Sequence, residues 1–232
     1  MLKAAAQDST TEPHAALMDR VYRHQRYIYD ATRKYYLFGR DRLIRELDLR
    51  PGEHAVEIGC GTARNLICIA RRYPRTRLYG LDASQEMLKT AARKVARAGL
   101  ADRITLRHGY AEQLTPRLFE RPAPFDRAIF SYSLSMIPDW HQALRSSTAA
   151  LAPSGRLHVV DFGDLAGLGG VGAGLMRRWL ALFHVEPRIE ILGALESGVQ
   201  LNSFKNNGLS VLAGRYAFVL NCGKHEISGL VG

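Results

Sequence analysis

Glycines and acidic residues occur together in one short stretch, in a pattern that could bind a nucleotide-like ligand. Glu57 is followed by Gly59 and Gly61, directly after a short apolar run. Glycine has no Cβ, so the backbone can turn sharply here and approach a ligand closely. A helix that begins after this turn would direct its free N–H groups at the same ligand. A glycine-rich turn alone is a weak signal, because a tight strand-to-helix turn without a ligand has the same glycines.

A second acid makes the ligand-binding interpretation stronger. Asp82 ends the next apolar run, and the residues between the two motifs are enough for one helix. An acid at this place suits the two hydroxyls of a ribose. The turn differs from a nicotinamide fingerprint, because Glu57 precedes the first glycine and the third small residue is Ala63. A carboxylate at the strand end would repel a pyrophosphate, and a turn without a ligand leaves both acids unexplained.

The order Glu-x-Gly-x-Gly-x-Ala followed by a strand-end aspartate resembles the first motif and the ribose acid of class I S-adenosylmethionine (SAM) methyltransferases. The resemblance implies a Rossmann-like α/β fold, with a seven-stranded, mostly parallel sheet that ends in an antiparallel hairpin. It also implies SAM as the cofactor and S-adenosylhomocysteine (SAH) as a product. In such a site Glu57 holds the methionine amine and Asp82 binds the ribose, while Gly59 and Gly61 give close backbone passage.

The same resemblance assigns the residues around the adenine. Ala83 and Met87 are expected to pack on the ring. Many family members have Gly-Asp-Ala after the third strand, where the acid binds the adenine amino group, but here Tyr110 replaces the acid. We therefore expect Tyr110 to stack on the adenine or to bond it through its hydroxyl, with the Ala111 amide contacting the ring. Ser131 ends the fourth strand, where this family places the methyl group.

Alternating apolar segments predict a parallel sheet with helical crossovers. The expected strands are His54–Ile58, Arg77–Asp82, Ile104–Arg107, Phe125–Ser131 and Leu157–Asp161. The expected helices are Arg64–Arg72, Ser84–Ala98 and Asp139–Leu151. A turn is expected at Pro153–Gly155 and an amphipathic helix at Gly163–Phe183. Two strands, Val199–Lys205 and Tyr216–Asn221, are expected to form the terminal hairpin. Before the sheet, His14–Leu49 is predicted to be helical with a break near Gly39. We divide the chain into a helical cap that faces lipid, 1–48, and a methyltransferase domain, 49–232.

The composition fits one α/β domain with a modest appendage, since the chain has 232 residues of which 47% are hydrophobic. No run approaches the ~20 apolar residues of a membrane span. The start of the chain turns polar too soon for a signal peptide. The three cysteines lack metal-ligand spacing, so we expect no metal and a reducing cytosol.

The formal net charge of +10 allows three interpretations. It can serve solubility alone, a nucleic-acid surface or an anionic membrane surface. Basic residues and tyrosines interleave most densely between Tyr22 and Ile44. This composition fits an amphipathic element at an anionic lipid interface, base stacking on nucleic acid, or a cap helix packed on the domain. The chain has no recognisable RNA-binding module, and it lacks the Asn/Asp-Pro-Pro-Tyr element of nucleobase N-methyltransferases.

The segment Tyr22–Ile44 resembles the methyltransferase component of betaine-lipid synthesis, a diacylglyceryl-homoserine N-methyltransferase, and Ser131–Trp140 and Phe183–Arg188 are similar to the same group. The resemblance implies trimethylation of the homoserine amino group at the cytoplasmic face of the membrane. Its partners would be a diacylglycerol-based lipid, an anionic membrane surface and the enzyme that supplies diacylglyceryl-homoserine, with no nucleic acid. Phosphatidylethanolamine N-methyltransferases resemble the chain too, and a SAM-binding scaffold without turnover is a further alternative. The apolar segment 165–183 would be a membrane-dipping lid, or an ordinary helix on one sheet face.

Methyl transfer to an amine is an in-line displacement in which positioning supplies most of the acceleration. Tyrosine faces suit a nitrogen that becomes cationic, and an arginine can pair with the carboxylate of SAM or of homoserine. The aromatic candidates are Tyr27, Tyr29, Tyr36 and Tyr132, of which the resemblance places Tyr29 close to SAM. The arginine candidates are Arg33 and Arg40, whose alternative is binding to the anionic surface. His184 is the one histidine proposed as a base, with a packed or surface histidine as its alternative.

Overall fold

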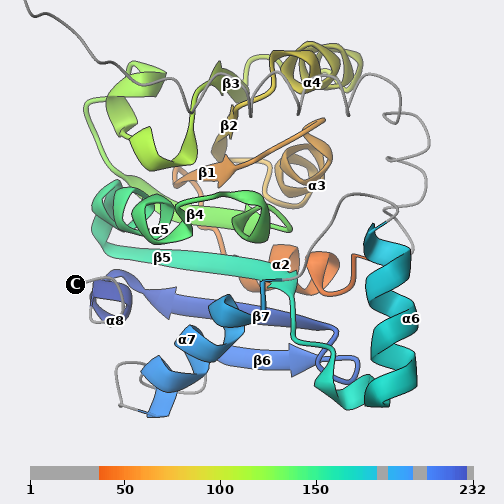
Figure 1. Ribbon diagram of the computed structural model, residues 1–232. Helices are drawn as coiled ribbons and strands as arrows, with labels where there is room; N and C mark the ends of the chain where they lie inside the picture. Colours follow the sequence, from red (N-terminus) through yellow and green to blue (C-terminus); the bar gives the residue numbers. More distant parts are fainter. Residues whose placement is uncertain (1–36, 182–187, 201–207, 229–232) are drawn as a thin grey trace, which may run out of the picture.

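A seven-stranded sheet forms the centre of the structure, in the order β3-β2-β1-β4-β5-β7-β6 (Figure 1). The structure is a computed structural model that describes residues 37–181, 188–200 and 208–228. The strands are β1 His54–Ile58, β2 Arg77–Asp82, β3 Ile104–His108, β4 Phe125–Ser131, β5 Leu151–Phe162, β6 Leu209–Leu212 and β7 Ala217–Gly223. Strands β1 to β5 pair in parallel, while β7 is antiparallel to both β5 and β6. The expected fold class is therefore confirmed.

Helices cover both faces of the sheet and bury two separate hydrophobic clusters. One cluster contains residues of α2 Arg40–Glu46, α3 Arg64–Arg72, α4 Gln85–Arg97 and α6 Gly169–Ala181. The other contains residues of α5 Trp140–Ala149, α7 Ile189–Gln200, α8 Lys224–Ser228 and the 3₁₀ turns η1 Ala111–Gln113, η2 Pro116–Phe119 and η3 Leu134–Met136. Neighbouring strand residues alternate between the two clusters, as Ala55 and Val56 do. The result is a three-layer α/β/α architecture (Figure 1).

The C-terminal hairpin is present, but its first strand was predicted at the wrong place. Val199 and Gln200 end helix α7, and the rest of the predicted strand Val199–Lys205 lies outside the described residues. The strand that pairs with β7 is β6 at Leu209–Leu212. The predicted second strand corresponds to β7, whose pairing with β5 runs over seven residues. The long pairing with β5 fixes β7, whereas β6 has four residues and pairs with β7 alone among the described strands.

The turn predicted at Pro153–Gly155 lies inside β5 rather than before it. Leu151 pairs with Phe125 of β4, and Arg156 pairs with Arg127, so the intervening residues of β5 bulge out of the ladder. The strand therefore begins earlier than the predicted start at Leu157, and the proline-glycine turn forms an irregularity within it.

Helix α2 begins directly after the predicted break at Gly39, which has φ 85°. Its Leu43 and Ile44 belong to the same cluster as helices α3 and α4. The predicted helical region before residue 37 lies outside the described residues, and the proposed domain division at 48/49 stays a prediction. In the described part of the chain, no helix combines the length and the apolar composition that a membrane crossing requires.

Candidate functional site

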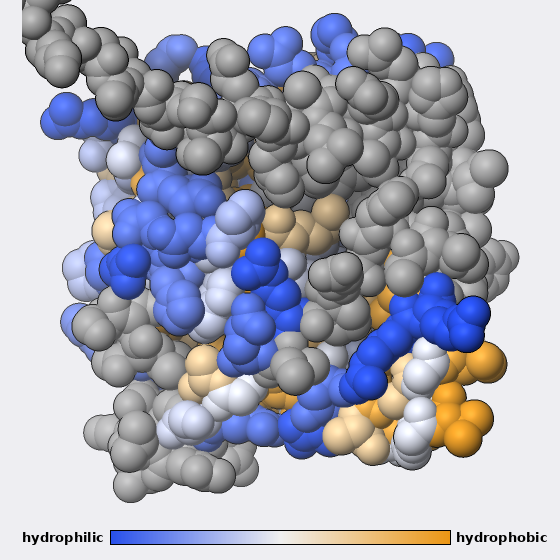
Figure 2. Space-filling model, in the orientation of Figure 1, coloured by the Kyte–Doolittle hydropathy of each residue, from blue (hydrophilic) through white to orange (hydrophobic). Residues whose placement is uncertain are grey.

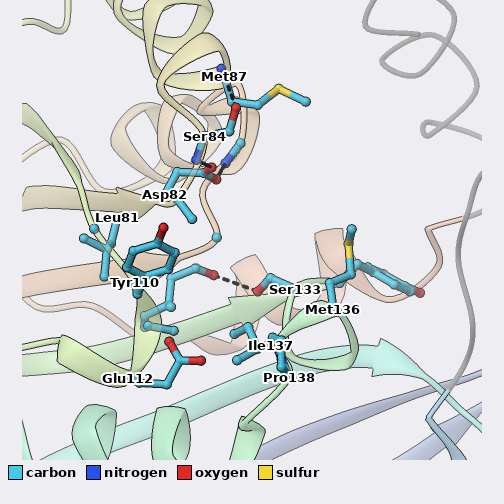
Figure 3. Close-up of a pocket in the computed structure, with 17 residues that line it drawn as sticks. Leu81, Asp82, Ser84, Met87, Tyr110, Glu112, Ser133, Met136, Ile137 and Pro138 are labelled. Atoms are coloured by element: carbon cyan, nitrogen blue, oxygen red, sulfur yellow. Dashed lines mark hydrogen bonds between the residues drawn. The ribbon is translucent and has the colours of Figure 1, made fainter. Parts of the chain in front are cut away.

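A cavity opens at the carboxyl ends of β1, β2 and β4, where the sheet order changes direction between β1 and β4. Ligands of open α/β sheets bind at such a switch point. In Figure 3, Asp82, Ser84 and Met87 lie on one side of the cavity, and Met136, Ile137 and Pro138 lie across from them. The other lining residues are Ile58, Gly59, Gly61, Leu81, Ala83, Gly109, Tyr110, Ala111, Glu112, Tyr132 and Ser133.

The turn between β1 and α3 requires left-handed backbone at three alternate positions. Gly59, Gly61 and Ala63 have φ angles of 71°, 54° and 61°. A Cβ on Gly59 would lie 2.5 Å from the Cβ of Ser133, so the turn packs directly against the loop after β4. The Ser133 hydroxyl donates to the Ile58 carbonyl at 2.7 Å and holds the two loops together. The glycines therefore allow a close approach that any side chain at Gly59 would block.

The Asp82 carboxylate is held in place by two backbone amides. Gly61 donates to one oxygen at 2.7 Å, and Ser84 donates to the other at 2.9 Å. The Ser84 hydroxyl also caps α4 by accepting from the Met87 amide at 3.3 Å. A carboxylate accepts hydrogen bonds at about four lone-pair sites on its two oxygens. A pair of vicinal hydroxyls matches this acceptor set.

A second, polar cavity adjoins the first at Gly59 and Gly61, which line both. The Glu57 carboxylate lies buried in its wall and accepts from the Asn65 amide at 2.7 Å. Arg40 is also buried at this cavity. The remaining lining residues are Cys60, Thr62, Arg64, Lys94 and Ser131. A wall that combines a buried carboxylate with basic side chains suits a ligand that carries both an ammonium and a carboxylate group.

The hydrogen bonding of the Ser131 hydroxyl indicates whether this polar cavity accommodates a ligand. Ser131 is buried, and its Oγ has no hydrogen-bond partner among the residues that the structure describes. A buried hydroxyl without a partner is costly, and in native proteins such groups are usually satisfied. An additional polar group in the cavity would satisfy it. The amino-acid end of SAM is such a group, so the residues fit this cofactor.

The loop after β4 is fixed by the buried Asp161 at the end of β5. Its carboxylate accepts from the Ser135 amide at 3.0 Å and from the Ser135 hydroxyl at 2.7 Å. Burial raises the pKa of Asp161, and the hydrogen bonds from Ser135 and Phe162 oppose that shift. These bonds position the turn that carries Met136 and Ile137 along the cavity wall.

Tyr132 lies at the cavity, but its hydroxyl is directed elsewhere. The side chain is only 2% exposed, and its hydroxyl donates to the Phe38 carbonyl at 2.6 Å. Burial raises the pKa of this phenol well above its usual range. The ring packs edge-on against Phe162 with the centroids 4.7 Å apart. Tyr132 thus connects the segment before α2 to the sheet, and its part in a cation-binding cage stays a prediction.

The structure brings most of the predicted site residues together around the two cavities. Glu57, Gly59, Gly61, Asp82, Ala83, Met87, Tyr110, Ala111, Ser131 and Arg40 all line one cavity or the other. Their binding roles stay predictions. The remaining candidates lie outside the described residues: Tyr27, Tyr29, Arg33, Tyr36 and His184.

Sequence reasoning did not single out several lining residues. Glu112 follows Ala111 by one position, so the predicted adenine-contacting segment could have been extended to include it. Met136, Ile137 and Pro138 follow β4 closely, but nothing in their types indicates a cavity wall. Their placement depends on the bonds of Ser133 and Asp161, which connect residues far apart in the sequence.

Comparisons with known proteins agree with this architecture. Residues 55–155 match the family described as methyltransferase domain. A demethylmenaquinone methyltransferase of Bacillus cytotoxicus is 33% identical over 119 residues, which are 51% of this chain and 48% of that protein. One of Listeria monocytogenes serotype 4a is 31% identical over 132 residues, 55% of this chain and 52% of that protein. The chain thus spans about half the length of these curated relatives.

Two solved structures resemble the fold over most of the chain. The apo form of the SAM-dependent methyltransferase SibL matches with a TM-score of 0.62 at 22% identity, over 84% of this chain and 57% of that one. A SAM-dependent methyltransferase from Aquifex aeolicus matches with a TM-score of 0.56 at 18% identity, over 82% and 92%. The chain therefore has the class I methyltransferase fold, and SAM is the cofactor that its site fits.

Proposed function

We propose that this chain is a SAM-dependent methyltransferase that trimethylates the homoserine amino group of diacylglyceryl-homoserine at the inner face of the membrane. The observation that carries methyl transfer is the pair formed by the glycine turn and Asp82. Both lie at the switch point of the sheet, within the region that matches the methyltransferase domain. Phosphatidylethanolamine is the alternative lipid acceptor.

Each part of the site has a separate binding task under this proposal. Bound SAM supplies a methyl group that its sulfonium already activates. The carboxylate of Asp82 accepts from the ribose hydroxyls, in the orientation that the Gly61 and Ser84 amides impose. In the polar cavity, Glu57 receives the methionine amine and Arg40 the carboxylate. Holding the reactants in one geometry is the main contribution that the protein makes to such a displacement.

The lining of the first cavity favours an amine acceptor next to an apolar body. Besides Asp82, which is assigned to the ribose, the described lining of this cavity carries the carboxylate of Glu112, and none of its residues is basic. Negative groups favour an acceptor whose nitrogen becomes cationic, and they disfavour an anionic polymer such as RNA. The side chains of Met136, Ile137 and Pro138 form an apolar wall across the cavity from Asp82 (Figure 3). An amine attached to a lipid combines both properties.

The curated relatives support a second candidate acceptor. They are named demethylmenaquinone methyltransferases, and they match this chain over about half of their length. A demethylated menaquinone would be a lipophilic acceptor without an amine. It would use the apolar wall, but it would give the carboxylate of Glu112 no cationic group to stabilise.

A turnover assay with methyl-labelled SAM tests these acceptors side by side. Vesicles would contain diacylglyceryl-homoserine, phosphatidylethanolamine or a demethylated menaquinone, and the lipids would be separated afterwards. We expect label in mono-, di- and trimethylated homoserine lipid. Label confined to phosphatidylethanolamine or to the quinone would replace the substrate assignment. Bound SAM without label in any lipid would overturn the lipid proposal.

A further inference from the structure

The outer side of helix α6 exposes apolar side chains that the rest of the described structure does not cover. Val171 is 88% exposed and Leu175 is 73% exposed, the highest values among the large hydrophobic residues of the described part. The two residues are one helical turn apart and therefore adjacent on the helix surface. Figure 2 shows hydrophobic residues gathered at the lower right, where α6 lies in Figure 1.

The inner side of the same helix accounts for its attachment to the fold. Ala173 and Leu180 are buried seven positions apart and belong to the hydrophobic cluster on that face of the sheet. Val171 and Leu175 each lie two positions from Ala173, which is about 200° around a helix of 3.6 residues per turn, so they lie on the opposite side. The exposed pair is thus not needed to pack α6 on the sheet. Its exposure requires a separate explanation.

The charges around this pair are positive. Helix α6 contains no acidic residue, and its second half carries Arg177 and Arg178, both exposed. Arg178 follows Leu175 by three positions, so it extends the same exposed stripe. It has no ion pair or hydrogen bond within the described residues. The nearest acid before the helix, Asp164, is already paired with Arg215 at 2.7 Å.

We propose that the stripe of Val171, Leu175 and Arg178 docks on an anionic lipid bilayer. A shallow apolar insertion flanked by arginines is the pattern by which interfacial helices bind such surfaces. The net charge of +10 adds long-range attraction to the same partner. Two large apolar side chains among glycines are a small patch, whereas a stable protein interface buries about 1,200 Å² or more. The chemistry therefore favours a lipid surface over a second copy of the chain.

The position of α6 relates this surface to the cavity. Strand β5 ends at Phe162, beside the carboxyl ends of the parallel strands β1 and β4. Helix α6 follows after the short turn η4, Ala166–Leu168. A membrane that contacts α6 thus lies at the carboxyl end of the strands, as the cavity does. The inference extends the proposed function, because an enzyme that methylates a lipid must reach it at a membrane surface.

Co-sedimentation of the full chain with vesicles tests the surface directly. The vesicles would be phosphatidylcholine alone or an equal mixture of phosphatidylcholine and phosphatidylglycerol. We expect the double variant Val171→Asp and Leu175→Asp to bind the anionic vesicles at least about tenfold more weakly than the unaltered chain. The matched control is Leu118→Asp, which alters an apolar side chain 36% exposed on η2. We expect this control to bind within about twofold of the unaltered chain.

A second variant keeps the test decisive if the aspartates disturb folding. Arg177→Gln with Arg178→Gln leaves the apolar residues in place, and it should lower binding most at low salt. Equal binding of all variants would overturn the proposal, as would a dimer of the unaltered chain that the aspartates dissociate. Methylation of detergent-dispersed lipid separates the two ideas. If the unaltered chain methylates the dispersed lipid but does not bind anionic vesicles, the docking surface alone is rejected. If it binds the vesicles but methylates no lipid, the function alone is rejected.

Discussion

Asp82 is the residue on which cofactor affinity should depend most. Its two oxygens are oriented by the amides of Gly61 and Ser84, so no side-chain ordering remains to be done when hydroxyls bind. Hydrogen bonds to a charged group contribute about 1.5–3 kcal/mol each. Losing two of them should weaken SAH binding by about a hundredfold or more.

Isothermal titration of Asp82→Ala with SAH measures this loss. The control is Asp102→Ala, which removes an exposed carboxylate in the loop before β3. We expect the control to keep its affinity. An unchanged dissociation constant for Asp82→Ala would remove the ribose assignment.

His158 makes the stability of the fold depend on pH. It is 1% exposed in the middle of β5, and burial, aided by Arg127 and Arg156, lowers its pKa from 6.5 to about 3. The unfolded chain therefore binds one more proton than the folded chain between these two pH values. Its contribution to stability is fully present above pH 6.5 and is lost as the pH falls toward 3, by about 1.4 kcal/mol per pH unit.

Urea unfolding between pH 4 and pH 7 checks this expectation. His158→Leu should show a shallower loss of unfolding free energy in acid than the unaltered chain. The exposed His225→Leu is the control and should keep the full slope. Identical slopes for all three proteins would show that His158 does not titrate during unfolding.

The residues of the glycine turn could be predicted because their spacing is local. Glu57, Gly59 and Gly61 follow one another within a single turn, and Asp82 ends the next strand in the sequence. Glu112 and the apolar wall after β4 could not be predicted in the same way. Their positions depend on contacts between segments far apart in the chain, such as the bond from Ser135 to Asp161.

At the scale of elements, the cavity depends on the close contact between the β1–α3 turn and the loop after β4. Gly59→Ala would place a Cβ 2.5 Å from Ser133, at a φ of 71°. Gly99→Ala imposes the same unfavourable backbone at φ 67°, but nothing lies within 4 Å of the added Cβ. Comparing these two variants separates the effect of backbone strain from the effect of a steric clash with the loop after β4.

Both variants should lose about 1–2 kcal/mol of stability from the left-handed backbone. Only Gly59→Ala should also weaken SAH binding, by about tenfold or more, because the loop after β4 must move away. Thermal unfolding and SAH titration of the two proteins measure the two effects. Equal SAH affinity of both variants would show that this loop contact does not shape the site.

The five parallel strands were predictable as elements because each is a short apolar run next to a helix. Strand β6 was not, because it is short and lies at the sheet edge, where its pairing with β7 determines it. The first two residues of the predicted strand, Val199 and Gln200, instead end helix α7. Strand propensity depends on neighbours that a local pattern does not contain.

At the scale of the whole molecule, one sheet separates two hydrophobic clusters and places the site at their common edge. Cys60 in the turn after β1 belongs to one cluster, and Leu134 in the loop after β4 belongs to the other. A ligand at this edge therefore contacts segments that both halves of the core support. We expect the two halves to unfold together and to be stabilised together.

Thermal unfolding with and without SAH tests this expectation. At about one hundred times its dissociation constant, a ligand that binds only the folded state adds about 2.7 kcal/mol to stability. For a chain of this size, each kcal/mol raises Tm by about 2–4 °C, so SAH should raise Tm by about 5–11 °C in one transition. Asp82→Ala should show no comparable shift at the same SAH concentration. A second transition that SAH leaves unmoved would instead show that α6, β6 and β7 unfold apart from the cofactor site. The described residues that line the site come from α2, β1, β2 and β4 and from the segments that follow β1 to β4.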